Sequence, residues 1–392
     1  MSHYDVVVIG AGPAGNLCAA LTAEAGLSTL VLEEHEAAGL FVNCTGIIGA
    51  EAFSRLNLPT DQVLSHLQRI TFFAPSGHSF RYDPEQPLAY IVSRQQFDQS
   101  LAELAQSQGA QYRFGYHARL LRVDSDEVEI REQEEADPIQ ANVVVIATGF
   151  GTNLPAQVGL SSPREIIYGA QAEVEMDGLK DVEIYLGREV APEAFAWVVP
   201  LCSTDSPENS TGPARIGLVA RKQAPMYFKK LLNHPLIRDR IRTPQPKMLL
   251  SPVPMQPMER SYADRVLVVG EAAGQVKTTT QGGIYYGMLC AGMAAEAIRY
   301  AAKKGSFRSR ILRRYHQAWM NTIGQELKMG LSLRQIFSRL SDSQIDALVE
   351  LGLRDDIISL VKRLAQFDWH RDLIRSSMKL PVLKEVAKGV LW

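Results

Sequence analysis

The chain has 392 residues, of which 46% are hydrophobic and 21% charged, and its formal net charge at pH 7 is -2. This length suffices for two domains or for one large domain with an insertion, and the near-neutral charge gives no reason to expect a nucleic acid partner. No apolar run approaches the roughly 20 residues that span a bilayer, and the four cysteines lack the spacing of a zinc site or disulfide framework, so we expect a cytoplasmic protein with no bound metal.

A glycine-rich turn follows the first apolar stretch of the chain. Residues Tyr4 to Ile9 read as a buried strand, and Gly10, Gly12 and Gly15 follow in G-x-G-x-x-G spacing. Gly10 allows the tight turn, Gly12 lets a pyrophosphate approach the backbone, and Gly15 lets the next helix pack closely on the strand. The predicted helix, Pro13 to Ala25, would present its free N–H groups to that phosphate.

An acidic residue ends the second predicted strand, Ser28 to Leu32. The Glu33 carboxylate can accept hydrogen bonds from both hydroxyls of an adenosine ribose, and we count the neighbouring Glu34 with it as a candidate cofactor ligand. Strand, turn, helix, strand and acid therefore fall in the order of a dinucleotide-binding unit. The alternative is a βαβ turn with a structural role only.

The next segment, residues 35–49, reads as a loop that contains Cys44. In a flavin enzyme this part of the chain tends to pass the isoalloxazine ring, which makes Cys44 a candidate for both chemistry and cofactor contact. The competing interpretation is a small buried hydrophobe with no chemical role. Beyond it, Glu51 to Leu67 is predicted as a helix, and Arg69 to Phe73 with His78 to Tyr82 as a hairpin.

A helix is predicted from Ser93 to Gly109, with Arg94 in its first turn. A cation is unfavourable against the helix dipole there, which indicates an anionic partner such as a cofactor phosphate; a solvated surface arginine is the alternative. After two short strands between Gly115 and Arg131, the apolar strand Ala141 to Thr148 ends at Gly149. The segment Thr148-Gly149 is a second place where backbone can approach a cofactor.

Alternating apolar and polar residues dominate between residues 161 and 258, which predicts an inserted antiparallel sheet. Such a sheet usually holds the substrate. Phe195 and Trp197 share one of its faces, and the pattern does not separate a pocket wall from ordinary core. The dinucleotide domain then resumes with the strand Arg265 to Val269.

The resumed domain carries two further glycine motifs, GEAAG at residues 270–274 and a helix that opens at Gly282-Gly283. The N-terminus of this helix is suited to the flavin pyrimidine oxygens. After it, residues 306–392 read as consecutive helices, with a capping box at Ser341 and Gln344. Lys379 to Trp392 mixes lysines with apolar residues, as helices at a membrane surface do, although such a pattern also packs on its own domain.

Together these motifs resemble the p-hydroxybenzoate-hydroxylase-like FAD superfamily and, within it, the geranylgeranyl reductase family. The family's substrate motif P-x-x-Y-x-W-x-F-P is matched in PEAFAWVVP at its prolines and at Trp197, with Phe195 in place of the tyrosine. Glu271 replaces the usual shorter aspartate, and Thr45 interrupts the cysteine turn. The residues that carry the cofactor part of the resemblance are Gly10, Gly12, Pro13, Ala14, Gly15, Glu33, Arg94, Thr148, Gly149, Gly270, Glu271, Gly282, Gly283 and Ile284.

The resemblance implies an FAD-dependent oxidoreductase that saturates carbon–carbon double bonds of an isoprenoid or prenylated lipid. It implies Cys44 in proton delivery or in shaping the site, and Phe195 and Trp197 as the lining of an apolar channel. NAD(P)H and ferredoxin both stay open as the electron donor, and the C-terminal helices are a candidate for peripheral membrane contact. Flavin monooxygenases and quinone-linked dehydrogenases share most of these features and are the alternatives.

The predicted fold is therefore α/β, with a Rossmann-like FAD-binding domain, an inserted antiparallel sheet and a C-terminal helical region. The predicted boundaries are 1–160 with 259–305 for the FAD-binding domain, including a small hairpin insertion near 69–92. The substrate domain is expected at 161–258 and the helical region at 306–392.

Overall fold

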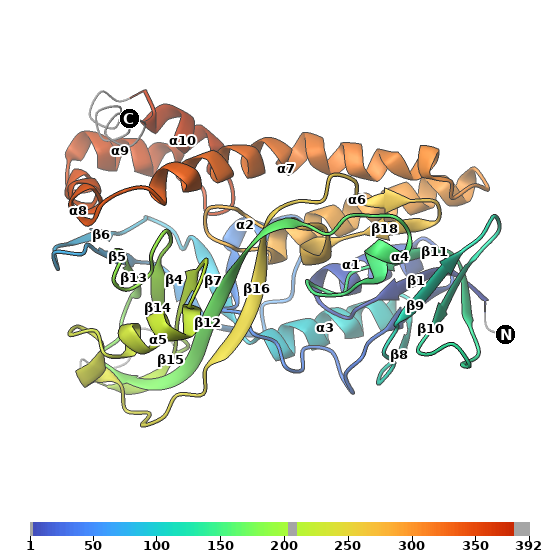
Figure 1. Cartoon of the computed structure of the whole chain (residues 1–392), viewed down its shortest axis with the longest axis horizontal. Helices are drawn as coiled ribbons and strands as arrows, with labels where there is room; N and C mark the ends of the chain where they lie inside the picture. Colours follow the sequence, from blue (N-terminus) through green and yellow to red (C-terminus); the bar gives the residue numbers. More distant parts are fainter. Residues whose placement is uncertain (1–2, 203–209, 380–392) are drawn as a thin grey trace. The chain divides into compact units, whose positions relative to one another are not determined.

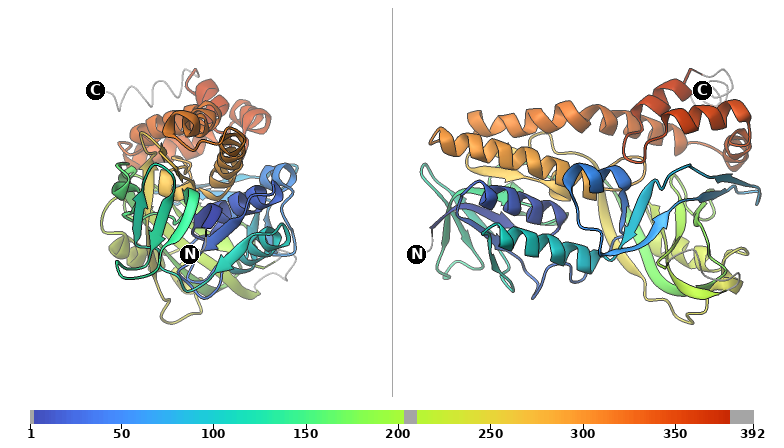
Figure 2. Two further views of the ribbon diagram at one scale, coloured as in Figure 1. Left: turned by 90° about the vertical axis from the view of Figure 1, so that its right-hand side faces the viewer. Right: turned by 180° about the vertical axis from the view of Figure 1, so that it is seen from behind.

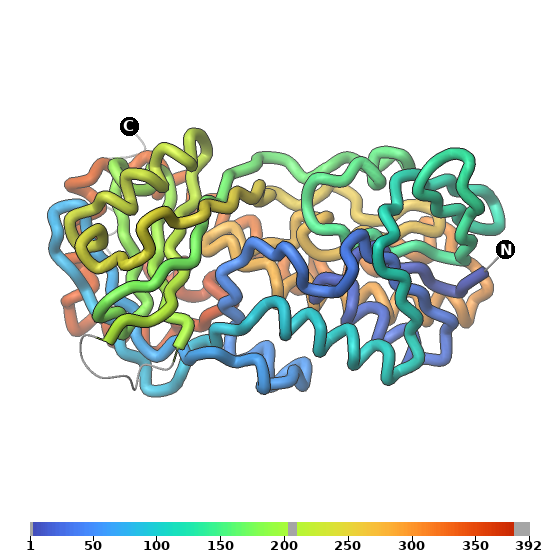
Figure 3. Tube along the Cα trace, turned by 90° about the horizontal axis from the view of Figure 1, so that it is seen from below, coloured from blue at the N-terminus to red at the C-terminus, as the bar shows by residue number. Residues whose placement is uncertain are grey.

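The structure is a computed structural model that describes residues 3–202 and 210–379. It divides into two compact units, and Figure 3 traces the chain as it passes between them. Unit 1 comprises the described residues up to Val42 together with Arg94–Glu165 and Pro254–Leu327. Unit 2 comprises Asn43–Ser93, Ile166–Val253 and the described residues from Lys328 onward.

A mainly parallel sheet forms the centre of unit 1 (Figure 1). Its parallel strands lie in the order β8 (Gln111–Arg113), β2 (Thr29–Leu32), β1 (His3–Ile9), β11 (Ile139–Ile146), β18 (Val266–Val268). β17 (Tyr262–Ala263) pairs antiparallel with β18, and the hairpin of β9 (Leu120–Val123) and β10 (Val128–Arg131) pairs antiparallel with β11. The central strands are apolar runs because both of their faces are buried.

The parallel strands end at the same level of the sheet. Ile9 is paired with Leu32 on one side and with Ile146 on the other, and Ile146 is paired with Val268. In an open parallel sheet, ligands bind outside the carboxyl ends of the strands, where the strand order reverses. This register places the segments that follow β1, β2, β11 and β18 at one edge of the sheet.

Helices cover the sheet of unit 1, and α1 (Pro13–Glu24) packs against both α3 (Arg94–Ser107) and α6 (Ile284–Lys303) (Figure 2). Small residues allow the close approach: a Cβ atom at Gly287 would lie 3.2 Å from the Gly270 Cα atom and 3.5 Å from the Ala14 Cβ atom. The short helix α4 (Leu154–Gln157) and the 3-10 turn η2 (Gly270–Ala273) complete the edge at the strand ends.

A seven-stranded sheet forms the centre of unit 2. Its order is β16 (Leu249–Gln256), β12 (Arg164–Asp177), β15 (Thr211–Ala220), β14 (Ala196–Pro200), β13 (Val182–Tyr185), β5 (Ile70–Phe73), β6 (Ser79–Tyr82). Neighbouring strands from β12 to β13 run antiparallel, and β13 and β5 run parallel. One face packs on α5 (Ala224–Leu232), close to the 3-10 turn η1 (Arg238–Arg240).

A smaller sheet packs on the opposite face of the seven-stranded sheet. It consists of β3 (Ile47–Gly49), β7 (Ala89–Val92) and β4 (Val63–Leu67). The shared core contains Leu67 and Ile91 from the small sheet and Val182 and Val199 from the large one. The seven-stranded sheet is therefore covered on both faces around β13 and β14.

The C-terminal part is helical, as predicted. α7 (Ser309–Phe337) begins in unit 1, and α8 (Asp342–Leu351), α9 (Asp355–Leu364) and α10 (Arg371–Ser377) follow in unit 2. The predicted capping box is present, since the Gln344 amide donates to the Ser341 hydroxyl and the Ser341 amide to the Gln344 side chain. None of the helices within the described residues is long and apolar enough to cross a membrane. The predicted interfacial segment, residues 379–392, lies outside the described residues after its first position.

Two sequence-based expectations differ from the structure. The hairpin expected inside the FAD-binding domain extends the sheet of unit 2 instead, because β5 pairs with β13, and the whole stretch 43–93 belongs to that unit. The helix expected from Glu51 to Leu67 is only α2 (Ala50–Leu56) followed by β4. Asn57 adopts a left-handed conformation with φ of 49° and ends this helix.

Candidate cofactor site and substrate face

The glycine turn after β1 forms an open surface at the N-terminus of α1. Gly10 has φ of +106°, and a Cβ atom there would lie 2.5 Å from the Ala147 carbonyl oxygen. A Cβ atom at Gly15 would overlap the Gly10 carbonyl, whereas one at Gly12 would meet no atom within 4 Å. No side chain of the described residues caps α1, whose N-cap is Gly12. The first N–H groups of the helix are therefore available to an anion.

Glu33 lies beside this turn, immediately after β2. One of its carboxylate oxygens accepts a hydrogen bond from the Ala11 amide at 2.8 Å. The other lies 2.6 Å from His35 Nδ1 and 3.1 Å from the His35 amide nitrogen. The carboxylate is therefore held at the strand end, with acceptor capacity left for sugar hydroxyls.

Glu34 has a different environment. Its side chain is 52% exposed and lies 3.6 Å from His117 Nδ1. A contact between Glu34 and the cofactor stays a prediction.

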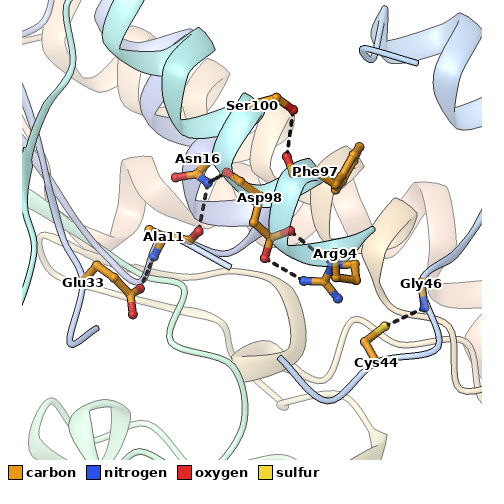
Figure 4. Close-up of polar contacts among 9 residues, drawn as sticks. All are labelled: Ala11, Asn16, Glu33, Cys44, Gly46, Arg94, Phe97, Asp98 and Ser100. Carbon is orange, nitrogen blue, oxygen red and sulfur yellow. Dashed lines mark hydrogen bonds and ion pairs between the residues drawn. The ribbon is translucent and has the colours of Figure 1, made fainter. Parts of the chain in front are cut away.

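Arg94 forms a bidentate ion pair with Asp98, one turn further along α3 (Figure 4). The nitrogen–oxygen distances are 3.1 and 2.9 Å, and the Asp98 side chain is 1% exposed. Burial raises the pKa of Asp98, while the Arg94 guanidinium opposes this rise. The pair fixes the guanidinium in the first turn of α3, the position for which the sequence predicted an anionic partner.

Asn16 joins three parts of the site, and sequence reasoning missed it. Its side-chain nitrogen donates to the carbonyl oxygens of Ala11 and Asp98, both at 2.9 Å (Figure 4). Its side-chain oxygen accepts from the Tyr112 hydroxyl at 2.8 Å. The only signal in the sequence was a polar residue near the start of a mostly apolar helix.

Glu271 lies in η2, close to the Thr148-Gly149 segment that follows β11. A Cβ atom placed on Gly149, which has φ of +69°, would lie 3.6 Å from a Glu271 carboxylate oxygen. Burial raises the pKa of Glu271 to about 7, although the positive charge of Arg94 and a backbone hydrogen bond from Phe150 oppose the rise. The charge of Arg94 therefore acts on the Glu271 carboxyl.

A buried chain of hydrogen bonds holds the start of η2. The Gly270 amide donates to the Gln275 side-chain oxygen at 2.7 Å, and the Gln275 side-chain nitrogen donates to the Tyr315 hydroxyl at 2.8 Å. Tyr315, on α7, donates in turn to the Val268 carbonyl oxygen at 2.7 Å. Neither Gln275 nor Tyr315 was predicted from the sequence, because nothing local marks a tyrosine on a distant helix as a partner of this turn.

The helix predicted at Gly282-Gly283 is α6, with Gly283 as its N-cap and Ile284 as its first residue. No side chain of the described residues caps it. The Lys277 amide donates to the Gly282 carbonyl oxygen at 3.0 Å and closes the loop before the helix. Unit 1 thus brings together all of the predicted cofactor residues except Glu34, whose side chain pairs elsewhere, and Cys44, which belongs to unit 2.

These residues fit an FAD. The open space at Gly12 and the uncapped end of α1 suit the pyrophosphate, and the fixed Glu33 carboxylate suits the ribose. The uncapped end of α6 provides a second set of N–H donors for polar oxygens of the flavin ring.

The other predicted site residues lie on one face of the large sheet in unit 2. The Phe195 and Trp197 ring centroids are 5.9 Å apart. Trp197, on β14, is paired with Gly217 of β15, where a Cβ atom would lie 2.5 Å from the indole, so the glycine provides the space for the ring. The indole Nε1 is buried without a hydrogen-bond partner among the residues that the structure describes.

Cys44 lies in a turn of unit 2, partly buried, with its sulfur 3.4 Å from the Gly46 amide nitrogen that donates to it (Figure 4). The turn is bound to β15, the strand next to that of Trp197, and to β12, the strand beyond β15. The sequence predicted Cys44 as part of the FAD-binding domain because this cysteine follows Glu33, the predicted ribose ligand. In the structure, the contacts of the Cys44 turn are with the predicted substrate sheet.

Comparisons with known proteins extend over both units. A family model described as pyridine nucleotide-disulphide oxidoreductase matches residues 4–181. Digeranylgeranylglycerophospholipid reductase of Methanocaldococcus jannaschii is 32% identical over 373 residues, covering 92% of this chain and 93% of that protein. Digeranylgeranylglycerophospholipid reductase 2 of Methanopyrus kandleri is 31% identical over 380 residues, with coverages of 92% and 93%.

Solved structures share the fold. A geranylgeranyl bacteriochlorophyll reductase-like protein from Thermoplasma acidophilum has a TM-score of 0.84 at 22% identity, covering 99% of this chain and 98% of that one. A variant of halogenase PltM, solved in complex with FAD, has a TM-score of 0.70 at 15% identity, with coverages of 99% and 94%.

The Rossmann-type sheet and its glycine, acid and helix-terminus site define an FAD-dependent oxidoreductase. Its second unit adds the antiparallel sheet, with the cysteine turn and the aromatic pair on one face. The chain belongs to the geranylgeranyl reductase family, whose members include the digeranylgeranylglycerophospholipid reductases. This confirms the family, fold class and cofactor predicted from the sequence.

Proposed function

We propose that this protein saturates the carbon–carbon double bonds of geranylgeranyl chains, and that its substrate is a glycerophospholipid carrying two such chains. The observation that carries the proposal is the extent of the similarity. At 32% identity over 92% of the chain, the archaeal reductase matches the substrate sheet as well as the FAD-binding unit. A similarity confined to the cofactor would have supported only a flavoprotein.

When bound in its reduced form, FAD supplies a hydride for one carbon of the double bond. The other carbon then needs a proton, and we assign this role to the Cys44 thiol. The Gly46 amide that donates to the sulfur would stabilise the thiolate left after proton transfer, and water would restore the thiol proton. The two electrons and two hydrogens of the saturated bond are thereby accounted for.

An isolated alkene carries no polar group that hydrogen bonds could hold, so the protein must orient it by shape and exclude water. We assign this role to Phe195 and Trp197, whose rings lie together on one face of the sheet. Among the residues that the structure describes, the buried indole N–H has no hydrogen-bond partner, which supports this assignment because no polar contact there holds Trp197 elsewhere.

The test is an anaerobic incubation of the chemically reduced protein with a panel of polyprenyl lipids, followed by mass spectrometry and flavin absorbance. Addition of hydrogen pairs without oxygen, as the flavin reoxidises, is the expected result and identifies the lipid. Addition of oxygen only after air is admitted would replace the proposal with a monooxygenase. Flavin reoxidation by quinones alone would replace it with a dehydrogenase.

The role of Cys44 has its own test. We expect a Cys44→Ala variant to retain FAD but to lose most of its lipid saturation, while Cys202→Ala, another partly buried free thiol in unit 2, retains it. Full turnover by Cys44→Ala would remove the cysteine from the mechanism.

The electron donor is tested by mixing the oxidised protein anaerobically with NADPH, NADH or reduced ferredoxin and following the loss of flavin absorbance. We propose that one of these three reduces the flavin directly. Reduction by none of them would contradict this.

We also propose peripheral membrane contact through the C-terminal segment, since the proposed substrate is a membrane lipid. Deletion of residues 382–392 should weaken binding to liposomes more than it lowers FAD content. Unchanged liposome binding would contradict this part of the proposal.

A further inference from the structure

The turn that carries Cys44 is attached to the large sheet of unit 2 by side chains on both sides of the cysteine. Before it, the Asn43 side-chain nitrogen donates to the Ser251 hydroxyl at 2.9 Å. After it, the Thr45 hydroxyl donates to the Gln171 side-chain oxygen at 2.8 Å. Thr45 is the residue that interrupts the family's cysteine turn in this sequence, and here it serves as an attachment point.

Arg215 provides a second attachment. Its Nη1 atom donates to the Thr45 carbonyl oxygen at 2.8 Å and to the Val92 carbonyl oxygen at 3.4 Å, and its Nε atom pairs with Glu173 at 2.9 Å. The Val92 amide donates to the Gly46 carbonyl oxygen at 2.9 Å, so both carbonyls bound by Arg215 belong to segments that hold the turn. Arg215 is only 9% exposed and Gln171 7% exposed.

The same face of the sheet carries Phe195 and Trp197, which together we call the aromatic wall. Gly217 is paired with Gln171 on one side and with Trp197 on the other, and the next row pairs Arg215 with Glu173 and Val199. Residues in directly paired positions have Cβ atoms about 5 Å apart on one face of a sheet. The anchors of the Cys44 turn and the Trp197 ring therefore occupy adjacent strands on a common face.

We infer that Arg215 and Gln171 are positioning residues that fix the Cys44 thiol in register with the substrate sheet. The sheet, and not the loop that follows Glu33, thereby determines where the thiol lies relative to a lipid chain on the aromatic wall. This inference rests on the proposed function for its catalytic meaning, but the attachment itself is a property of the turn and is tested without any lipid.

A buried guanidinium that donates to backbone carbonyls and a buried amide that accepts from a hydroxyl hold a loop in one conformation, because breaking one contact leaves a buried partner unsatisfied. Loss of these contacts should increase the access of solvent and of small reagents to the sulfur. It should also lower the fraction of molecules in which the thiol faces the alkene, which lowers kcat more than it raises KM.

The experiment measures the rate of iodoacetamide alkylation at Cys44, by mass spectrometry of the Cys44 peptide, in the FAD-loaded full chain. The variants are Thr45→Val, which removes one hydroxyl, and Arg215→Lys, which keeps the charge but replaces the separate Nη1 and Nε donors with one ammonium group. Thr45→Ser restores the hydroxyl. Thr211→Val is the matched control, because it removes a threonine hydrogen bond to Asp177 at the far end of β15.

We expect alkylation at Cys44 to be at least threefold faster in Thr45→Val and Arg215→Lys, with FAD affinity unchanged and rates near wild type in Thr45→Ser and Thr211→Val. Lipid saturation should fall about tenfold in kcat in the first two variants. The fall in kcat without an equal rise in KM, and its rescue in Thr45→Ser, separate a positioning role from a general loss of stability.

Alkylation rates within twofold of wild type in both anchor variants would overturn the inference. Faster alkylation with undiminished turnover would overturn the positioning role. Absence of lipid saturation by the wild-type protein would overturn the proposed function instead, and would leave the alkylation result as the test of the attachment.

Discussion

The side-chain nitrogen of Asn16, in the first helix, donates to the backbone carbonyl oxygen of Asp98, 82 positions later in the chain, at 2.9 Å. The same nitrogen donates to Ala11 in the glycine turn, so one buried amide connects the turn that approaches a pyrophosphate with the helix that carries Arg94. Asn16 is fully buried. The geometry of the cofactor edge therefore depends on a residue outside every recognised motif.

Replacing Asn16 with leucine should destabilise the protein by about 3 kcal/mol, because the carbonyls of Ala11 and Asp98 lose their donor in a buried environment. FAD affinity should fall with it. Tyr112→Phe, which removes only the hydroxyl that donates to Asn16, should cost about 1 kcal/mol. Urea unfolding of the apoproteins and FAD titration measure both effects. Equal costs for the two variants would contradict the central role of Asn16.

Alanine substitutions at two glycines of the same motif should affect different properties, one the affinity for FAD and the other the stability of the apoprotein. Gly12→Ala should leave the unfolding free energy of the apoprotein within about 0.5 kcal/mol of wild type, since the added methyl group meets no atom, yet it should weaken FAD binding by occupying the space of the pyrophosphate. Gly15→Ala should destabilise the apoprotein by about 1–3 kcal/mol, because its methyl group overlaps the Gly10 carbonyl. Chemical denaturation without FAD separates the two. A stable Gly15→Ala apoprotein would refute this account of the turn.

The adjacent acids Glu33 and Glu34 allow a matched comparison. Glu33→Gln should weaken FAD binding about tenfold to a hundredfold, because hydrogen bonds to a charged group contribute about 1.5–3 kcal/mol. Glu34→Gln should change the affinity by less than about threefold, since this side chain is exposed and faces His117. Fluorescence titration with FAD measures both. A larger effect at Glu34 would reverse the assignment of the ribose acid.

Glu271 should give the apoprotein a distinctive pH dependence. Burial raises the pKa of its carboxyl from 4.5 to about 7 in the folded protein. Between these two pH values the folded state holds more protons than the unfolded state, so the free energy of unfolding falls as the pH rises through this window. At 1.36 kcal/mol per pKa unit, the loss contributed by Glu271 is at most about 3 kcal/mol.

The Glu271→Gln variant should lack this part of the pH dependence. Urea unfolding of the two apoproteins at pH 5 and pH 8 should show a larger decrease for the wild type than for the variant. Asp98, whose pKa is also raised by burial, is present in both proteins and cancels in the comparison. Identical decreases would show that Glu271 does not titrate in this window.

The sequence predicted the glycine turn, the strand ends and the helix starts of unit 1 because their signals are local. A few consecutive residues with recognisable backbone requirements are enough to predict each of these features. They are the turn at Gly10, the acid at Glu33 and the start of α6 at Gly283. The parallel strand order then brings them together without further information, since consecutive βαβ units place their carboxyl ends at one edge. The family resemblance added the reaction class to this local information.

Alternation along β12 predicted a strand with two different faces, and the structure agrees: Ala170, Ala172 and Val174 pack in the core with α5. The sequence did not show what the opposite face contacts. Gln171 reads as a solvent-facing residue, yet it is buried and holds Thr45, 126 positions earlier. Period-two patterning indicates that a face is polar, but only the tertiary structure shows which distant groups bind its side chains.

The sequence by itself therefore determined the FAD-binding motifs, the strands and helices that carry them, and the family. The tertiary structure decided that Cys44 lies against the seven-stranded sheet of unit 2, that the hairpin after it extends that sheet, and that Asn16, Gln275 and Arg215 hold distant backbone segments. The physical reason is the range of the interactions involved. Turns and caps are specified by neighbouring residues, whereas a buried hydrogen bond between distant segments depends on the packing of the whole chain.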